Sequence, residues 1–121
     1  MKDDELLLLA AKAAGIKVQY SDNFGDYSIG EPYSKGEQRW NPLTFDKDAF
    51  RLMTSLRIYL VYPDFEACGD VVVARSPEVS GFIAEAPINR EGCRRVIVEI
   101  AAEIGRRGLS FQTGIDEMSG W

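Results

Sequence analysis

Apolar residues recur at three- and four-residue spacing in three stretches of this chain, a pattern that predicts three amphipathic helices. The first helix is expected to start at a cap formed by Asp3 or Asp4 and to end near Gly15. Its apolar stripe consists of Leu6, Leu9, Ala10 and Ala13. Because such a stripe must be covered to be stable, this helix is expected to dock on the rest of the domain.

The second and the last helix have clear start signals. Thr44 or Asp46 is the predicted cap of the second helix, and Asn89 is the predicted cap of the last one. The second helix should bury Ala49, Phe50, Met53 and Leu56. The last helix should end near Gly105 or Gly108 and bury Val96, Ile97, Ile100, Ala101 and Ile104. Its opposite face is expected to be solvated and to carry the ion pairs Glu91–Arg95, Arg95–Glu99 and Glu103–Arg107.

The segments between the helices have the patterns of strands and turns. Residues 16–20 alternate apolar and polar side chains, and residues 58–62, 71–74 and 82–86 are three β-prone runs that predict an antiparallel meander. Residues 21–38 are rich in turn residues and predict a long irregular loop or an excursion hairpin. The order of these elements predicts an α+β layered sandwich, in which about three helices cover a mainly antiparallel sheet.

Length and charge narrow the classes of function. The 121 residues are expected to form one domain over residues 1–107, with a variable loop at 21–39 and a C-terminal tail at 108–121. The net charge of −5 disfavours non-specific binding to nucleic acid, because phosphates would be repelled. No apolar stretch approaches the roughly 20 residues of a membrane helix, so no membrane attachment is expected. The two cysteines, Cys68 and Cys93, are too few for a disulfide framework and form no Cys-x-x-Cys pair, so reduced thiols and an intracellular protein are expected. Cys68 is a candidate nucleophile, but no positive field that would make it a thiolate is visible around it, so an inert thiol is favoured.

Three sequence segments carry a family resemblance. They are Trp40-Asn41-Pro42-Leu43-Thr44, the helical run Asp48-Ala49-Phe50-Arg51-Leu52, and the last helix from Arg94 to Gly105. Together with the opening helix from Leu6 to Gly15, they resemble the phage ABA-sandwich family of small phage and prophage proteins. The resemblance covers roughly residues 40–107. It implies a sheet between helical layers and an accessory protein in the cytoplasm of a bacterial host, and it implies no catalytic residues.

The composition excludes several chemistries. The chain has no histidine, which excludes Ser-His-Asp and Cys-His nucleophiles and the common histidine metal sites within it. It also has neither a dinucleotide glycine fingerprint nor a phosphate loop. The remaining acid candidates are Asp46 with Asp48, Asp64 with Glu66, and Asp22 with Asp26 and Glu31. Caps and turns explain these acids more simply, so no catalytic residue, metal or cofactor is predicted, and a carboxylate-dependent metal enzyme ranks last.

Two segments combine aromatic residues with features of a binding site. The candidate ligand- or partner-binding residues are Tyr27, Tyr33, Lys35, Arg39, Trp40, Phe111, Met118 and Trp121. In residues 20–40, aromatic rings and cations would suit a nucleotide or a protein surface, and the structural alternative is that Trp40 and some tyrosines cover a sheet edge. The tail would dock on a partner or a second copy, as in a homodimer, or fold back on its own domain.

Two classes of function follow from these patterns. The leading hypothesis is a non-enzymatic accessory binding protein of a phage or prophage that inhibits or masks a host protein of a defence or regulatory system. The alternative is a small-ligand protein that sequesters a nucleotide signal, with Lys35 and Arg39 on the phosphate.

Overall fold

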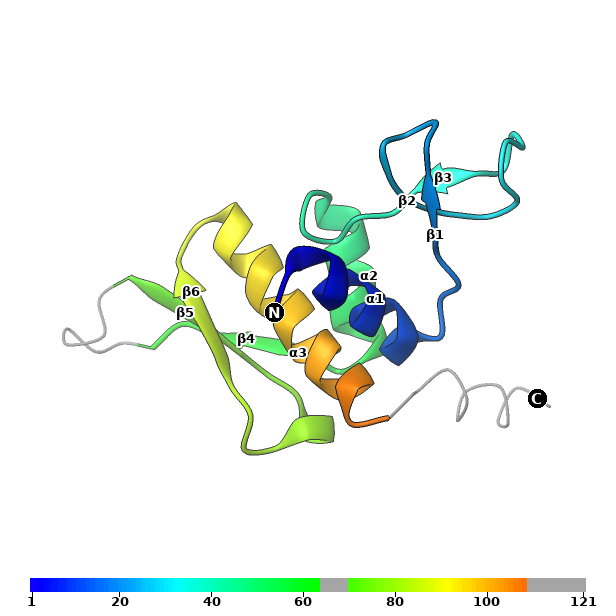
Figure 1. The fold of residues 1–121 in the computed structure, drawn as a ribbon. Coiled ribbons are helices and arrows are strands. Elements are labelled where there is room, and N and C mark those ends of the chain that lie inside the picture. Colours follow the sequence, from blue (N-terminus) through cyan, green and yellow to red (C-terminus); the bar gives the residue numbers. More distant parts are fainter. Residues whose placement is uncertain (64–69, 109–121) are drawn as a thin grey trace.

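The computed structural model describes residues 1–63 and 70–108 of this chain, and in them helices and strands combine as an α+β fold (Figure 1). The predicted fold class is confirmed. The helices are α1 (Asp3–Ala14), α2 (Asp46–Ser55), the short 3-10 helix η2 (Pro77–Val79) and α3 (Arg90–Arg106). The strands are β1 (Gln19–Ser21), β2 (Asp26–Ile29), β3 (Gln38–Arg39), β4 (Tyr59–Val61), β5 (Val71–Arg75) and β6 (Ala84–Pro87).

The strands form two separate antiparallel sheets, and the helices lie between them (Figure 1). One sheet has the order β4-β5-β6, which confirms the predicted meander. The other sheet has the order β1-β2-β3 and includes residues 21–39. For this segment the sequence predicted either an irregular loop or a hairpin, and β1 and β2 form a hairpin. The described helices all lie on one side of β4-β5-β6, whereas the family resemblance implies a sheet between helical layers.

The centre of the core is α3. It packs against α1 on one side and against β5 and β6 on another, so most of its circumference is covered. Its buried apolar residues are Val96, Ile97, Val98, Ile100, Ala101, Ala102 and Ile104, which include the whole predicted stripe. The predicted cap is also confirmed, because Asn89 Oδ1 accepts a hydrogen bond of 2.6 Å from the backbone N–H of Gly92.

Small residues allow α1 to approach α3 closely. Ala10, Ala13 and Ala14 of α1 are buried, and Gly105 of α3 lies directly beneath the backbone of Leu9. A Cβ atom at Gly105 would come within 2.1 Å of the Leu9 carbonyl oxygen. The alanine-rich sequence of α1 therefore determines how near the two helix axes lie.

The ends of α1 follow the sequence signals only in part. Gly15 ends the helix in the left-handed conformation, with φ of 70°, as the sequence predicts. No side chain caps the start, where Lys2 is the cap residue, so the predicted cap at Asp3 or Asp4 is wrong. Both acids lie in the first turn instead, where their charge complements the positive end of the helix dipole.

Asn41 connects the β1-β2-β3 sheet to α2. Its Nδ2 donates to both carboxylate oxygens of Asp26, at 2.9 and 3.1 Å, and its backbone N–H donates to Asp48 Oδ2 at 2.9 Å. Its own Oδ1 accepts from the backbone N–H of Leu43 at 3.0 Å, which forms a local turn. The motif around Trp40 is therefore the joint between the two halves of the fold.

The second helix differs from its prediction at its start and on one face. Phe45 is the cap residue of α2 and makes no side-chain cap, so the predicted caps at Thr44 and Asp46 are wrong. Ala49 and Leu56 are buried as predicted, but the Phe50 side chain is 59% exposed. The other helices cover only one side of α2. Consecutive side chains point about 100° apart around a helix, so Phe50 is turned away from the covered side on which Ala49 lies.

Glu103 is a buried carboxylate near the end of α3. It accepts hydrogen bonds from Arg106 Nε at 2.8 Å and from Arg107 Nε at 2.7 Å, which confirms the predicted pair with Arg107. Arg95 pairs with Asp3 of α1, at 2.6 Å, instead of with its predicted partners on α3. The hydrogen bonds from Arg106 and Arg107 outweigh the cost of burial and lower the pKa of Glu103 to about 2.

The Glu103→Gln substitution should therefore reduce stability near neutral pH and flatten its acid dependence. The ordinary pKa is 4.5, so between pH 4.5 and about 2 the unfolded chain binds more protons than the folded chain, and acid destabilises the native protein. Because both arginines are half exposed, we expect a loss of only about 1–2 kcal/mol near pH 7. Urea titrations at several pH values measure the stability of wild type and Glu103→Gln, with Glu91→Gln as an exposed control. Parallel plots of stability against pH for wild type and Glu103→Gln would contradict the prediction.

Candidate functional site

The binding residues predicted near the end of segment 20–40 have structural partners. Trp40 is 3% exposed and belongs to the core, which is the structural alternative that the sequence left open. Arg39 Nε donates to Asp26 Oδ2 at 2.8 Å, and its guanidinium lies 4.9 Å from the centre of the Phe45 ring. These two residues therefore hold the sheet to the helices, and Trp40 presents no free face to a ligand.

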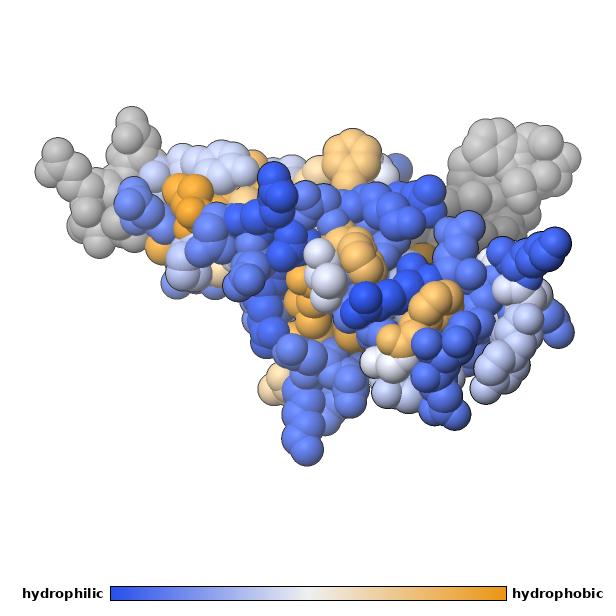
Figure 2. All heavy atoms as spheres, turned by 90° about the horizontal axis from the view of Figure 1, so that it is seen from above, coloured by the Kyte–Doolittle hydropathy of each residue, from blue (hydrophilic) through white to orange (hydrophobic). Residues whose placement is uncertain are grey.

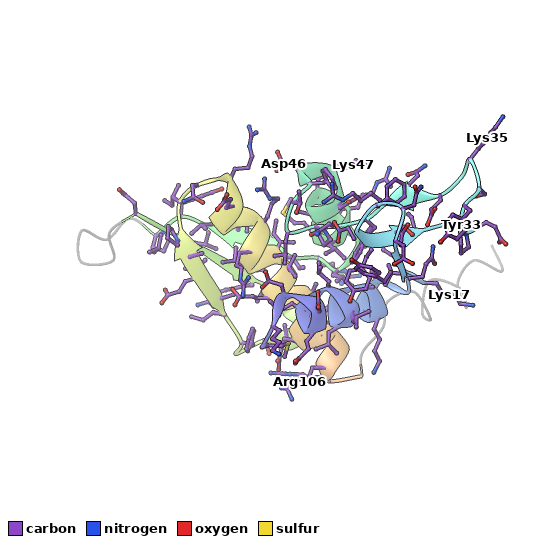
Figure 3. All side chains as sticks on the ribbon, turned by 45° about the horizontal axis from the view of Figure 1, so that its top comes forward. Lys17, Tyr33, Lys35, Asp46, Lys47 and Arg106 are labelled. Atoms are coloured by element: carbon purple, nitrogen blue, oxygen red, sulfur yellow. The ribbon has the colours of Figure 1, made fainter. Side chains whose placement is uncertain are left out.

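Tyr33 and Lys35 lie in the loop between β2 and β3, where both are exposed. Figure 3 shows Lys35 at the tip of this loop, pointing away from the protein. The backbone N–H of Tyr33 donates to Glu37 Oε1 at 3.1 Å, while its side chain is 78% exposed. Neither residue lines either of the two concave surfaces described below.

Tyr27 and the acids of the β1-β2-β3 sheet are held inside the sheet. Tyr27 is half-buried and packs edge-to-face on Tyr20, with ring centres 5.9 Å apart. The Ser28 hydroxyl donates to Glu37 Oε2 at 2.7 Å, and this bond lowers the pKa of Glu37. Burial raises the pKa of Asp26, but hydrogen bonds from Asn41 and Arg39 outweigh it and the net pKa is lowered. Glu37 and Asp26 are therefore ionised at neutral pH, and their carboxylates accept hydrogen bonds that hold the sheet together.

Several predicted candidates lie outside the described residues. They are Phe111, Met118 and Trp121 of the tail, together with Asp64, Glu66 and Cys68. In residues 1–63 and 70–108, no group of three or more acidic or cysteine side chains is placed to hold a metal ion. Within the same ranges, no helix has both the length and the apolar character to cross a membrane.

Apolar residues lie on the side of β4-β5-β6 that faces away from α3, beside the exposed charged residues Arg75 and Glu85. Directly paired residues share a face, so Leu60 and Ala74 point towards the core, while Val61 and Val73 point away from it. This outer face includes Tyr59, Val61, Val73, Arg75 and Ile83, and Tyr62 and Pro63 border it after the end of β4. Tyr59 and Ile83 are each 48% exposed, and the face encloses a shallow depression of about 520 Å³.

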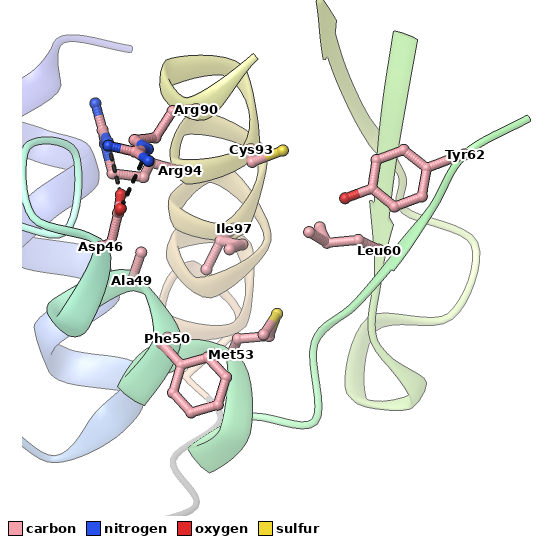
Figure 4. Close-up of a pocket in the computed structure, with 10 residues that line it drawn as sticks. All are labelled: Asp46, Ala49, Phe50, Met53, Leu60, Tyr62, Arg90, Cys93, Arg94 and Ile97. Carbon is pink, nitrogen blue, oxygen red and sulfur yellow. Dashed lines mark hydrogen bonds and ion pairs between the residues drawn. The ribbon is translucent and has the colours of Figure 1, made fainter. Parts of the chain in front are cut away.

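A second concave surface lies between α2 and β4, with α3 as its floor (Figure 4). We call it the α2–β4 groove, and its volume is about 470 Å³. Its apolar lining consists of Ala49, Phe50, Met53, Leu60 and Ile97. Its polar lining consists of Asp46, Arg90, Arg94, Tyr62 and Cys93. The exposed ring of Phe50 is thus part of a wall of this groove.

One end of the α2–β4 groove is charged. Asp46 Oδ1 accepts from Arg94 Nη1 at 2.7 Å, and Asp46 Oδ2 lies 3.4 Å from Arg90 Nε. Arg94 is further fixed by its Nε, which donates to the carbonyl oxygen of Leu43 at 2.8 Å. Asp46 and Asp48 therefore have different partners and do not form the acid pair that the sequence considered.

Two uncharged polar groups, Tyr62 and Cys93, lie near the charged end of the α2–β4 groove (Figure 4). Burial raises the pKa of the Tyr62 hydroxyl, and the adjacent Cys93 thiol raises it further. Figure 4 shows the Tyr62 hydroxyl directed towards Cys93. The polar groups therefore lie at one end of the groove, where Tyr62 faces Cys93 from the β4 side, and Phe50, Met53 and Ile97 lie towards the other end (Figure 4).

The sequence contained weak signals for both surfaces. On the outer face, Tyr59 and Val61 leave β4 apolar on both sides, which is unusual for a sheet with one solvated face. For the groove, the spacing of Arg90, Arg94 and Ile97 places them on neighbouring positions of one helix face. Neither pattern reveals its partner, because that partner comes from another element of the fold.

Figure 2 shows a mostly hydrophilic face with several separate hydrophobic patches. The resemblance to the phage ABA-sandwich family stays a prediction. Comparison with models of known protein families, with curated proteins and with solved structures finds no match for this chain.

Proposed function

We propose that this protein is a non-enzymatic binding protein whose outer face docks on another protein. The supporting observation is the exposure of Tyr59, Val61 and Ile83 together on one side of β4-β5-β6. Exposed aromatic and aliphatic residues that adjoin one another are typical of interaction sites, and tyrosine contributes a large, rigid contact surface.

The family resemblance supplies the biological setting of this proposal. In it, the protein is a phage or prophage accessory protein in the cytoplasm of a bacterial host, and its partner is a host defence or regulatory protein. Covering a functional surface of that partner would inhibit it without any chemical step. The acidic balance of the chain favours a partner with a basic rim around an apolar patch.

Tyr59→Glu should abolish capture of the partner while the protein stays folded. A carboxylate at the centre of a desolvated contact has no partner there, so we expect affinity to fall by at least about tenfold. The protein is used to capture partners from bacterial lysate, captured proteins are identified by mass spectrometry, and affinity is then measured by calorimetry. Tyr33→Glu is the matched control, because it makes the same change at another exposed tyrosine, in the loop between β2 and β3.

The two variants separate this proposal from the one based on residues 20–40. Loss of binding with Tyr33→Glu but not with Tyr59→Glu would show that the partner binds at the β2–β3 loop and not at the outer face. If neither variant affects capture, the outer face is not the contact surface. If no partner is captured, a thermal shift screen with nucleotides tests the alternative of ligand sequestration, since a ligand at a hundred times its dissociation constant adds about 2.7 kcal/mol.

A further inference from the structure

The α2–β4 groove has the composition of a small-molecule site, and Tyr62 separates it from the outer face. Its volume of about 470 Å³ lies within the range of ligand pockets, which is roughly 300–1,000 Å³. Five of its ten lining residues are apolar, and the polar residues are gathered towards one end. We propose that this groove binds a small amphipathic monocarboxylate, with its apolar body along α3 and its carboxylate at Arg90 and Arg94.

The charged end is suited to one negative charge. It contains two guanidinium groups and one carboxylate, which leaves a net charge of +1. Arg94 is only 13% exposed and is held in place by Asp46 and the Leu43 carbonyl, whereas Arg90 is 79% exposed at the rim. A carboxylate can pair with the guanidinium groups without the cost of ordering Arg94.

The same arrangement disfavours more highly charged ligands. A phosphate dianion would exceed the net positive charge and would lie near the Asp46 carboxylate. The sugar hydroxyls of a nucleotide would also lie against the apolar side chains of Met53, Leu60 and Ile97, where they would find no hydrogen-bond partner. An aliphatic or aromatic body fits these side chains better, and Phe50 provides a flat wall for it.

Cys93 provides a reporter inside the groove. The Cys68→Ser variant leaves Cys93 as the remaining thiol, and its alkylation by iodoacetamide is followed by mass spectrometry. Octanoate should slow alkylation in a saturable manner, and octan-1-ol should protect several-fold more weakly. From hexanoate to decanoate, affinity should rise with each added methylene group, by up to about fourfold where the group is fully buried. Amide shifts in nuclear magnetic resonance spectra provide a second readout that does not depend on the thiol.

Charge variants test the position of the carboxylate. Arg90→Gln should weaken octanoate binding about two- to fivefold, as expected for an exposed ion pair, while Arg51→Gln, on α2 but outside the lining, should leave it unchanged. Asp46→Asn should strengthen binding by a similar factor, because it removes the competing negative charge. Opposite signs for Arg90→Gln and Asp46→Asn are the signature of an anion at this end.

Three results would overturn the proposal. The first is that octanoate neither protects Cys93 nor shifts amide signals of the groove. The second is equal protection by octanoate and octan-1-ol with no effect of Arg90→Gln, which would leave a purely apolar contact. The third is protection that rises with protein concentration without octanoate, which would identify a second copy of the chain as the occupant.

Discussion

Trp40→Ala is expected to lower the free energy of unfolding by about 3–5 kcal/mol. The indole is 3% exposed and belongs to the hydrophobic core, so its truncation removes a large buried surface and leaves a cavity. The backbone N–H of Trp40 donates to the Tyr27 carbonyl at 2.9 Å, and the next residue is the joint between sheet and helices. Urea titration followed by far-ultraviolet circular dichroism measures the loss.

Tyr33→Ala is the control for Trp40→Ala, since both residues come from the same predicted binding segment. Tyr33 is 78% exposed, so its truncation should change stability by no more than about 0.5 kcal/mol. A loss below about 1 kcal/mol for Trp40→Ala would mean that the indole is not a core residue. If the expected loss is found, reduced partner binding by Trp40→Ala reports unfolding and not a lost contact.

Gly105→Ala should lower the free energy of unfolding by about 2–3 kcal/mol, although alanine is the better helix former. The new Cβ would lie 2.1 Å from the carbonyl oxygen and 2.9 Å from the carbonyl carbon of Leu9. Backbone atoms cannot rotate away as a side chain can, so α1 must move off α3 and loosen the alanine contacts around it. This overpacking outweighs the roughly 1 kcal/mol gained from helix propensity.

Gly36→Ala is the matched control for Gly105→Ala. A Cβ atom at Gly36 would meet only Ser34 Oγ, at 3.7 Å, which is an ordinary contact. We expect that variant to be neutral or slightly stabilised, because alanine restricts the unfolded chain. Chemical denaturation measures the free energy of unfolding of both variants and of wild type. Equal stability of Gly105→Ala and wild type would show that α1 and α3 are not in close contact.

The binding residues were harder to predict than the fold. Aromatic residues in a glycine-rich segment indicated a site around Tyr33 and Trp40, but one of these rings is exposed on a loop and the other is buried. Sequence composition cannot distinguish these cases, because burial depends on contacts with distant elements. Phe50 shows the opposite error, since helical spacing predicted a core residue and the structure places it on a groove wall.

The sequence by itself determined the local elements. Gly15 ends α1, Asn89 caps α3 and the apolar stripe of α3 is buried, because each of these features depends on backbone geometry and on neighbours within about one helical turn. The β4-β5-β6 meander also followed from short apolar runs separated by turn residues.

Only the tertiary structure decided which charges and surfaces come together. Asp46 meets Arg90 and Arg94, and Arg95 meets Asp3 at the other end of the chain, although helical spacing favoured partners on the same helix. The division of the strands into two sheets and the open outer face around Tyr59 likewise depend on how α3 packs. The physical reason is that an exposed ion pair contributes little free energy compared with the burial of an apolar face. The packing of the apolar faces therefore determines which charges meet, and the ion pairs do not determine the packing.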